Sequence, residues 1–397
     1  MKINISKLFS WVIILFLPLS LYEFIIPSVS IGDVLIMSSI VMGLIVAVKK
    51  KINNIFTLEI FIYILFIICN SMIQFIINNN EIDNGIFSLF RYLLFMTFVL
   101  IIPKHFLDRE YTYKYYQLMG TVFAIYSILQ FLCFYSFKII LPINILPFNT
   151  MSDFTRIQES SRYLDGIVLF RPYSVFIEPS YFAIYESYIL YWLVNKKENK
   201  NKKDLVSIIS ITIAMCLSGT TGIVMVMLSF IRKISKICLR NFFKTTLYIL
   251  ILGICIYTFF NTNYGKIMFN RIFSEDGLGS STEGRMGNLS ALKEEISNEP
   301  KTFIIGNGVW AEYEYLPTIG RVILNFGITG VIVIILLLYF LYKKSNKDGK
   351  EFMFLFIISF IATNSLFNIT SVLAFSLIIM NFRRKKNEKN RLSNMVW

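Results

Sequence analysis

The stretch VILNFGITGVIVIILLLYFLY, residues 322–342, is uncharged and almost wholly apolar, and Lys343 and Lys344 follow it directly. A helix needs about 20 such residues to cross the hydrocarbon core of a bilayer, so this stretch predicts a membrane-spanning helix. Similar stretches recur along the 397 residues, of which 55% are hydrophobic. The sequence therefore predicts an all-α, polytopic integral membrane protein with a single transmembrane domain over residues 1–397.

We expect about twelve transmembrane helices from these apolar stretches. The candidate spans are residues 8–26, 31–48, 56–77, 87–102, 115–136, 179–195, 204–217, 222–235, 245–260, 322–342, 352–365 and 369–382. Two regions, 204–231 and 352–382, allow either one long helix or two short ones. The placement of basic loops favours two helices in each region, although a helix of about 14 residues is only about 21 Å long.

The net charge of +14 is distributed as a membrane topology signal. Most of the 39 Lys and Arg residues lie at the N-terminus and in alternate connections: 49–51, 103–114, 196–203, 232–244, 343–351 and 383–391. Basic connections stay in the cytoplasm, so we expect both termini inside the cell and no nucleic-acid partner. Two long outer loops, 138–178 and 261–321, are then expected to form the active-site cleft, because loops of this length are usually functional.

The five cysteines and the single histidine indicate neither a disulfide framework nor a metal site. Four of the cysteines lie inside apolar stretches, and none has the spacing of metal ligands. His105 falls in a predicted cytoplasmic connection, where it would not serve chemistry on the outer face.

Arginine is the main basic residue away from the predicted cytoplasmic side. Its planar fork matches pairs of phosphate oxygens, which indicates a site for a phosphorylated lipid. The alternative is that these arginines pair with nearby acids. The residues concerned are Arg91, Arg156, Arg162, Arg171, Arg271, Arg285 and Arg321.

The segment RPYSVFIEPSYFAIY, residues 171–185, carries charges where the first outer loop returns to the membrane. Pro179 suits the first turn of a helix, which places Glu178 at the helix start. Three tyrosines follow on the same helical face, namely Tyr181, Tyr185 and Tyr188. Such a stripe could line a sugar cavity, because the rings offer flat faces and hydroxyl groups. The alternative is an aromatic belt at the membrane interface.

Two charged positions keep more than one interpretation. Glu178 could act as the general base for an acceptor hydroxyl, or it could orient Arg171 through an ion pair. Glu59 and Arg91 lie within predicted spans, where an unpaired charge is costly. The simplest interpretation is that these two form a mutual pair, and the alternative is that Arg91 contacts a lipid phosphate.

Three motifs together resemble a known family. They are RPYSVFIEPSYFAIY at 171–185, LSGTTG at 217–222, and the block that runs from Arg285 through IGNGVW to NFGITG at 325–330. Their order and spacing resemble the bacterial O-antigen and capsular polysaccharide polymerases of the Wzy type, in the group that also includes O-antigen ligases.

The resemblance implies an enzyme of capsular polysaccharide or lipopolysaccharide biosynthesis in the bacterial cytoplasmic membrane. Such polymerases join undecaprenyl-diphosphate-linked oligosaccharide repeats on the outer, periplasmic or extracellular face. They transfer the growing glycan to an incoming lipid-linked repeat. The implied enzyme is a glycosyltransferase that needs neither a metal ion, a nucleotide sugar nor a cofactor. Its expected partners are the lipid-linked donor and acceptor and membrane lipids, with a chain-length regulator and a flippase as candidates.

The resemblance also suggests roles for individual residues. Arg171 and Arg285 would stabilise the leaving diphosphate, and Glu178 would activate or position the acceptor hydroxyl. The expected substrate-binding residues are Arg271, Arg321, Arg162, Tyr181, Tyr185, Tyr315 and Ser218.

One departure bears on the choice between polymerase and ligase. Related ligases carry an outer-loop histidine, whereas the corresponding segment here reads EYEYLPTIGR at 312–321. Glu312, Glu314 and Tyr315 are then the substitute candidates for a base. The alternatives to polymerisation are ligase-type glycan transfer and a lipid-linked oligosaccharide flippase or transporter, for which the sequence shows no inverted repeat.

Overall fold

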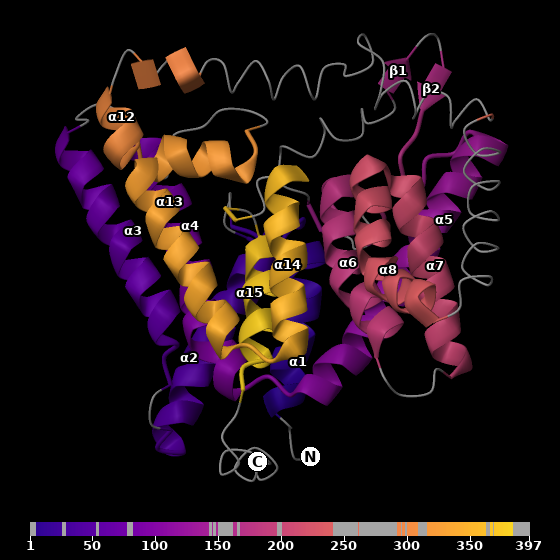
Figure 1. Ribbon diagram of the computed structural model, residues 1–397, viewed down its shortest axis with the longest axis horizontal. Helices are drawn as coiled ribbons and strands as arrows, with labels where there is room; N and C mark the ends of the chain where they lie inside the picture. Colours follow the sequence, from indigo (N-terminus) through magenta and orange to yellow (C-terminus); the bar gives the residue numbers. More distant parts are fainter. Residues whose placement is uncertain are drawn as a thin grey trace. The chain divides into compact units, whose positions relative to one another are not determined.

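The structure is a computed structural model, and it is mostly helical in the part of the chain that it describes (Figure 1). The described residues are 5–25, 29–52, 55–77, 82–142, 145, 148–149, 162–164, 167–196, 201–240, 261, 292–294, 296–297, 300–308, 316–362, 366–367 and 369–383. A helical fold is confirmed, with one addition that the sequence did not predict. Two short strands, β1 (Arg162–Leu164) and β2 (Ile167–Leu169), form an antiparallel hairpin in the first long loop.

Five helices in the described residues are long and apolar enough to cross a membrane. They are α2 (Ile31–Lys49), α3 (Leu58–Ile77), the Ile86–His105 part of α4 (Ile82–His105), α5 (Arg109–Phe137) and α13 (Thr318–Lys344). Shorter apolar helices include α1 (Ile5–Leu19), the start of α8 (Thr220–Arg240) and α15 (Thr370–Met380). Large apolar side chains such as Val48 and Ile76 are exposed on these helices, as expected where lipid is the solvent. These features define a membrane protein.

The chain divides into two compact units, whereas the sequence predicts one transmembrane domain. Unit 1 comprises residues 1–115 and 284–397, and unit 2 comprises residues 116–283. Helix α5 therefore contributes its first residues to unit 1 and the remainder to unit 2.

Unit 1 is a helical bundle around α4. Helices α2 and α15 pack against α4, while α1 packs against α2, and α14 (Lys347–Ala362) packs against α15. Helix α15 is buried along its whole length, including its three small polar residues Thr370, Ser371 and Ser376. On the side of α3 and α13, the short helix α12 (Pro300–Ile305) packs against α13.

Helix α13 contains a break that the sequence did not predict. Residues 322–342 were expected to form one continuous helix, but Gly327 has φ 63° and ψ −161° within it. A Cβ atom at Gly327 would lie 2.4 Å from the backbone of Ile304, so the end of α12 crosses α13 at this point. Gly306 and Gly308 both have positive φ, a conformation that favours glycine, at the turn that follows α12. Their N-terminal neighbour Ile305 accepts hydrogen bonds from α3 through its carbonyl oxygen.

Unit 2 contains a packed trio of helices: α6 (Pro179–Asn195), α7 (Lys202–Ser218) and α8. Figure 1 shows the three side by side. A capping box of Asn201 and Asp204 starts α7, and Asp204 also pairs with Lys196 Nζ at 2.5 Å. The other buried face of α6 meets the α5 residues of this unit through aromatic contacts.

The structure shows two helices in each of the two regions, 204–231 and 352–382, for which the sequence allowed one helix or two. Residues 204–231 form two helices, because α7 ends at Ser218 and α8 begins at Thr220. Residues 352–382 likewise contain the end of α14 and the separate helix α15. The predicted span at 245–260 lies outside the described residues.

The second long loop is described only in part. Residues 292–294 and 296–297 are helical. Leu292 is buried against Leu316 and Leu324, and Ile296 packs on this cluster.

Candidate functional site

Two of the family-like motifs meet in unit 2, where Arg171 lies against Gly219. The Nη1 atom of Arg171 is 3.6 Å from the position that a Cβ atom would take at Gly219. Gly219 has φ 139°, in the region that favours glycine, and it forms the turn between α7 and α8. A guanidinium from the first long loop is thus placed beside the first residues of α8.

The start of α8 adds backbone donors near this guanidinium. The carbonyl oxygen of Gly219 accepts the first hydrogen bond of α8, from the Ile223 N–H at 3.1 Å. The N–H groups of the preceding first-turn residues have no intrahelical acceptor, and a helix N-terminus carries partial positive charge. Arg171 and the N-terminus of α8 therefore combine to favour an anion.

Ser218 has a local structural role in this turn. Its side chain is buried, and its Oγ donates a hydrogen bond to the Met215 carbonyl at 2.8 Å. A Cβ atom at Gly222 would lie only 1.9 Å from that carbonyl oxygen, so the first turn of α8 lies directly on the last turn of α7. The predicted contact of Ser218 with substrate stays a prediction.

The segment that carries Arg171 is held by α5. Gln130 Nε2 donates to the Ser174 carbonyl at 2.9 Å, and the Ser174 N–H donates to Gln130 Oε1 at 2.8 Å. The Ser174 hydroxyl donates to the Phe123 carbonyl at 2.8 Å. Ser174 has φ 57°, which is uncommon for a residue other than glycine. The side chains of Ser174 and Gln130 are both fully buried. The sequence did not predict this anchor, because a single glutamine in an apolar helix does not indicate which residue it will bond.

Glu178 lies at the N-cap of α6, as predicted from Pro179. Its side chain is exposed, and the Ser180 hydroxyl donates to its Oε2 atom at 2.9 Å. It makes no side-chain capping bond to the helix backbone. An exposed carboxylate is accessible to an acceptor hydroxyl.

The predicted tyrosine stripe lies largely in the core of unit 2. Tyr181 is half-buried, whereas Tyr185 and Tyr188 are almost completely buried. The Tyr185 ring contacts Tyr116, Phe123 and Phe176, and the Tyr116 hydroxyl donates to the Tyr185 carbonyl. Sugar binding by Tyr185 would require this packing to open, so Tyr181 is the member best placed to meet a ligand.

A buried carboxyl group one residue beyond Tyr185 was missed from the sequence. Glu186 is fully buried, and neither of its carboxyl oxygens has a hydrogen-bond partner among the described residues. A Cβ atom at Gly120 of α5 would lie 2.7 Å from Glu186 Oε2, so a larger residue there would displace the glutamate side chain. The signal available in the sequence was a glutamate at the centre of a predicted span, which is costly unless the residue has a role.

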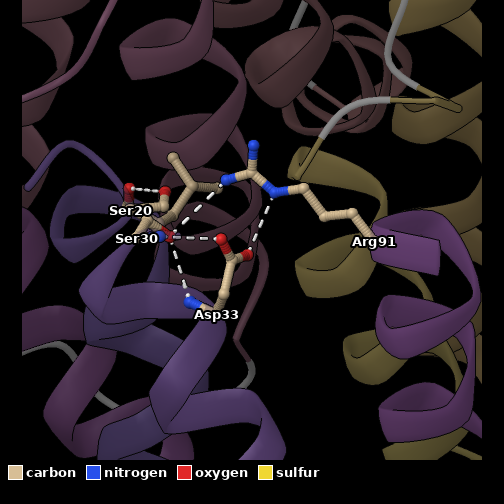
Figure 2. A network of polar contacts seen from close by, with 5 residues as sticks. Ser20, Ser30, Asp33 and Arg91 are labelled. Carbon is tan, nitrogen blue, oxygen red and sulfur yellow. Dashed lines mark hydrogen bonds and ion pairs between the residues drawn. The ribbon is translucent and has the colours of Figure 1, made fainter. Parts of the chain in front are cut away.

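The predicted mutual pair of Glu59 and Arg91 is wrong. Arg91 Nε donates to Asp33 Oδ1 at 3.0 Å, as Figure 2 shows, and Glu59 pairs with Lys344 Nζ. Arg91 and Glu59 lie on adjacent predicted spans, but each reaches a charge that is distant in the sequence. The prediction paired Glu59 with Arg91 because their spans are neighbours in the sequence. Which charged residues meet depends instead on how the helices pack in the bundle.

The remaining predicted site residues lie in different units or outside the described residues. Arg162 opens β1, with Leu169 as its strand partner, and it belongs to unit 2. Arg321 lies in the first turn of α13 and belongs to unit 1, so it is described separately from Arg171. Five candidates lie outside the described residues: Arg271, Arg285, Glu312, Glu314 and Tyr315.

The described residues contain no group of three or more His, Cys, Asp or Glu side chains that could hold a metal ion. The described candidate residues are Arg171, the backbone N–H groups at the start of α8, the exposed carboxylate of Glu178 and the half-buried Tyr181.

No protein-family model matches the chain, and the search of curated proteins also found no match.

Proposed function

We propose that this protein polymerises undecaprenyl-diphosphate-linked oligosaccharide repeats on the outer face of the bacterial cytoplasmic membrane. The growing glycan is transferred from its lipid carrier to the terminal sugar of an incoming lipid-linked repeat. The observation that carries the proposal is the position of Arg171 against Gly219 at the start of α8. This contact joins the first two motifs of the family resemblance into one anion-favouring site.

The chemistry assigned to the site is a glycosyl transfer. The acceptor hydroxyl oxygen forms a bond to the anomeric carbon of the donor, and the bond from that carbon to the diphosphate oxygen breaks. The diphosphate leaves with the electron pair, and Arg171 stabilises its developing charge. Glu178 accepts the proton of the acceptor hydroxyl or positions that hydroxyl.

The structural support for Arg171 in this role is preorganisation. The segment 171–178 is fixed to α5 by the paired hydrogen bonds between Gln130 and Ser174. A charge that is fixed before the substrate arrives loses little conformational entropy on binding, so more of its interaction energy is available to the transition state.

The proposed topology has about twelve spans, both termini in the cytoplasm and the loops 138–178 and 261–321 outside. It is supported by the basic connections and by the division of residues 204–231 into α7 and α8, which returns the basic end of α8 to the cytoplasmic side. In this arrangement the Gly219 turn and Arg171 face the outer leaflet together.

The test is polymerisation by the purified full-length protein in detergent or nanodiscs. The substrate is a lipid-linked repeat unit without any nucleotide sugar, and the products are resolved by size. We expect a ladder of products, and an Arg171→Lys variant should lose about 100-fold in rate, since a point charge does not replace the planar fork. Arg109→Lys is the matched control, because Arg109 pairs with Asp348 in unit 1 and is far from this chemistry in the sequence.

Other products would identify the alternatives. A single transfer onto a different acceptor without a ladder would indicate a ligase. Movement of the intact lipid-linked repeat across the bilayer without any new glycosidic bond would indicate a flippase. An Arg171→Lys variant with the full wild-type rate would reject the assignment of the leaving-group role.

A further inference from the structure

Arg91 is a second arginine in an apolar setting, and it belongs to unit 1. It lies in the Ile86–His105 part of α4 that is long and apolar enough to span a membrane. A charged side chain in such a segment is costly unless it is paired or used. Its side chain is 28% exposed, while that of its partner Asp33 is only 8% exposed.

The carboxylate of Asp33 is held in place from the side of its own helix. Its Oδ2 atom accepts a hydrogen bond from the Ser30 N–H at 2.9 Å, and the Asp33 N–H donates to Ser30 Oγ at 3.0 Å. These two bonds form the capping box that starts α2. The positive end of the helix dipole further stabilises this carboxylate, so Asp33 is fixed independently of Arg91.

This arrangement leaves Asp33 only one oxygen for Arg91. Arg91 Nε donates to Oδ1 at 3.0 Å, and Nη2 is 3.5 Å from Ser30 Oγ, at the long limit for a hydrogen bond. The Phe95 ring lies one helical turn further along α4, with its centroid 5.7 Å from the Arg91 Cζ atom. The guanidinium is thus oriented by a carboxylate, a hydroxyl and a ring.

The edge of the guanidinium that carries Nη1 and Nη2 is not used by Asp33. Figure 2 shows the guanidinium reaching Asp33 through Nε, with Nη2 toward Ser30. No hydrogen bond to Nη1 is formed by the residues that the structure describes. An ion pair that served charge neutralisation alone would gain from a bidentate geometry with both carboxylate oxygens. Here Oδ2 of Asp33 accepts from the capping box, and the terminal fork of Arg91 makes only the long Nη2 contact to Ser30 Oγ among the described residues.

We propose that the Nη1–Nη2 edge of Arg91 binds a phosphate group carried by a membrane lipid. Two parallel N–H bonds to two phosphate oxygens match the spacing of the fork. Asp33 and Ser30 act as positioning residues that fix the plane of the guanidinium, and partial exposure lets a lipid headgroup reach it. Basic side chains between transmembrane helices are a known mode of headgroup recognition. The phosphate comes either from a phospholipid or from the diphosphate of an undecaprenyl carrier, and only the second source rests on the proposed function.

The test measures lipid retention by native mass spectrometry of the full-length protein in detergent. Phosphatidylglycerol and undecaprenyl diphosphate are added separately at increasing concentrations. The occupancy of the tightest lipid adduct is measured at each concentration. Arg91→Lys keeps the charge that Asp33 needs but removes the fork. The double variant Asp33→Asn/Arg91→Gln removes both charges together and so leaves no unpaired carboxylate. Arg109→Lys changes another aspartate-paired arginine of the same unit and serves as the matched control.

We expect the tightest adduct to weaken about tenfold in Arg91→Lys and in the double variant, since hydrogen bonds to charged groups are lost. The adduct of Arg109→Lys should match the wild type. Equal retention by all variants would overturn the proposal, as would a wild-type protein that retains neither lipid. Retention of phosphatidylglycerol alone identifies a phospholipid site, and retention of undecaprenyl diphosphate identifies a carrier site. Polymerisation is tested through Arg171, so its failure leaves a phospholipid site at Arg91 intact.

Discussion

The anchor between Gln130 and Ser174 makes a prediction about local stability. In Gln130→Leu, the volume of the side chain is nearly kept, but the N–H and C=O of Ser174 each lose a buried partner. Leaving a buried polar group unsatisfied costs about 1–3 kcal/mol. Two such groups give roughly 2–6 kcal/mol, which is large compared with a typical total stability of about 5–15 kcal/mol.

This cost should appear locally, because the lost bonds connect residues 171–178 to α5 rather than holding a helix together. We expect amide hydrogen exchange in a peptide covering 170–178 to rise at least about 30-fold, as 2 kcal/mol corresponds to that ratio. Peptides from α13 in unit 1 should exchange at the wild-type rate. The rate of polymerisation should fall as well, since Arg171 is no longer preorganised.

Gln117→Leu is the matched control for this experiment. Gln117 is also a glutamine of α5, but its amide group bonds only the side chains of Asp204 and Ser207. The control should leave exchange in 170–178 unchanged. Unchanged exchange in Gln130→Leu, or an equal rise throughout both units, would refute the view that Gln130 positions the Arg171 segment.

Three further predictions follow from close contacts. Gly120→Ala places a Cβ 2.7 Å from Glu186 Oε2 and should lower the stability measured by thermal unfolding by about 1–3 kcal/mol. Adding Glu186→Ala should relieve the clash, so a double variant whose loss equals the sum of the two single losses would contradict this contact. Lys344→Gln leaves the nearly buried Glu59 unpaired and should lower the melting temperature. The double variant Lys344→Gln/Glu59→Gln should recover most of the lost melting temperature, and a double variant as unstable as the single one would count against the pair. Gly327→Ala should destabilise the protein by at least about 1–3 kcal/mol, because the alanine meets a strained φ and the backbone of Ile304; a wild-type melting curve would exclude the break in α13.

Much of the helical layout could be predicted from the sequence, since it depends on local hydrophobicity. The bounds of α2, α3 and α6 agree with the predicted spans to within two residues. The start of α6 was predictable from Pro179, and the separation of α7 from α8 followed from the placement of basic residues. Each of these features depends on residues close together in the chain.

Partners across the bundle could not be predicted in the same way. Arg91 pairs with Asp33 rather than Glu59, although all three lie in apolar helices. The hairpin of β1 and β2 was also missed, because its strands have three residues each and too few positions to show a period.

The sequence by itself determined that this is a helical membrane protein, and it located the polar segment around Arg171, because apolar length and charge are local properties of the chain. Only the tertiary structure decided that Arg171 lies against Gly219 and that Gln130 anchors Ser174. The same holds for the burial of Tyr185 and Glu186 and for the crossing that breaks α13 at Gly327. The physical reason is that these contacts join residues from different helices or loops, and their geometry depends on how the helices pack.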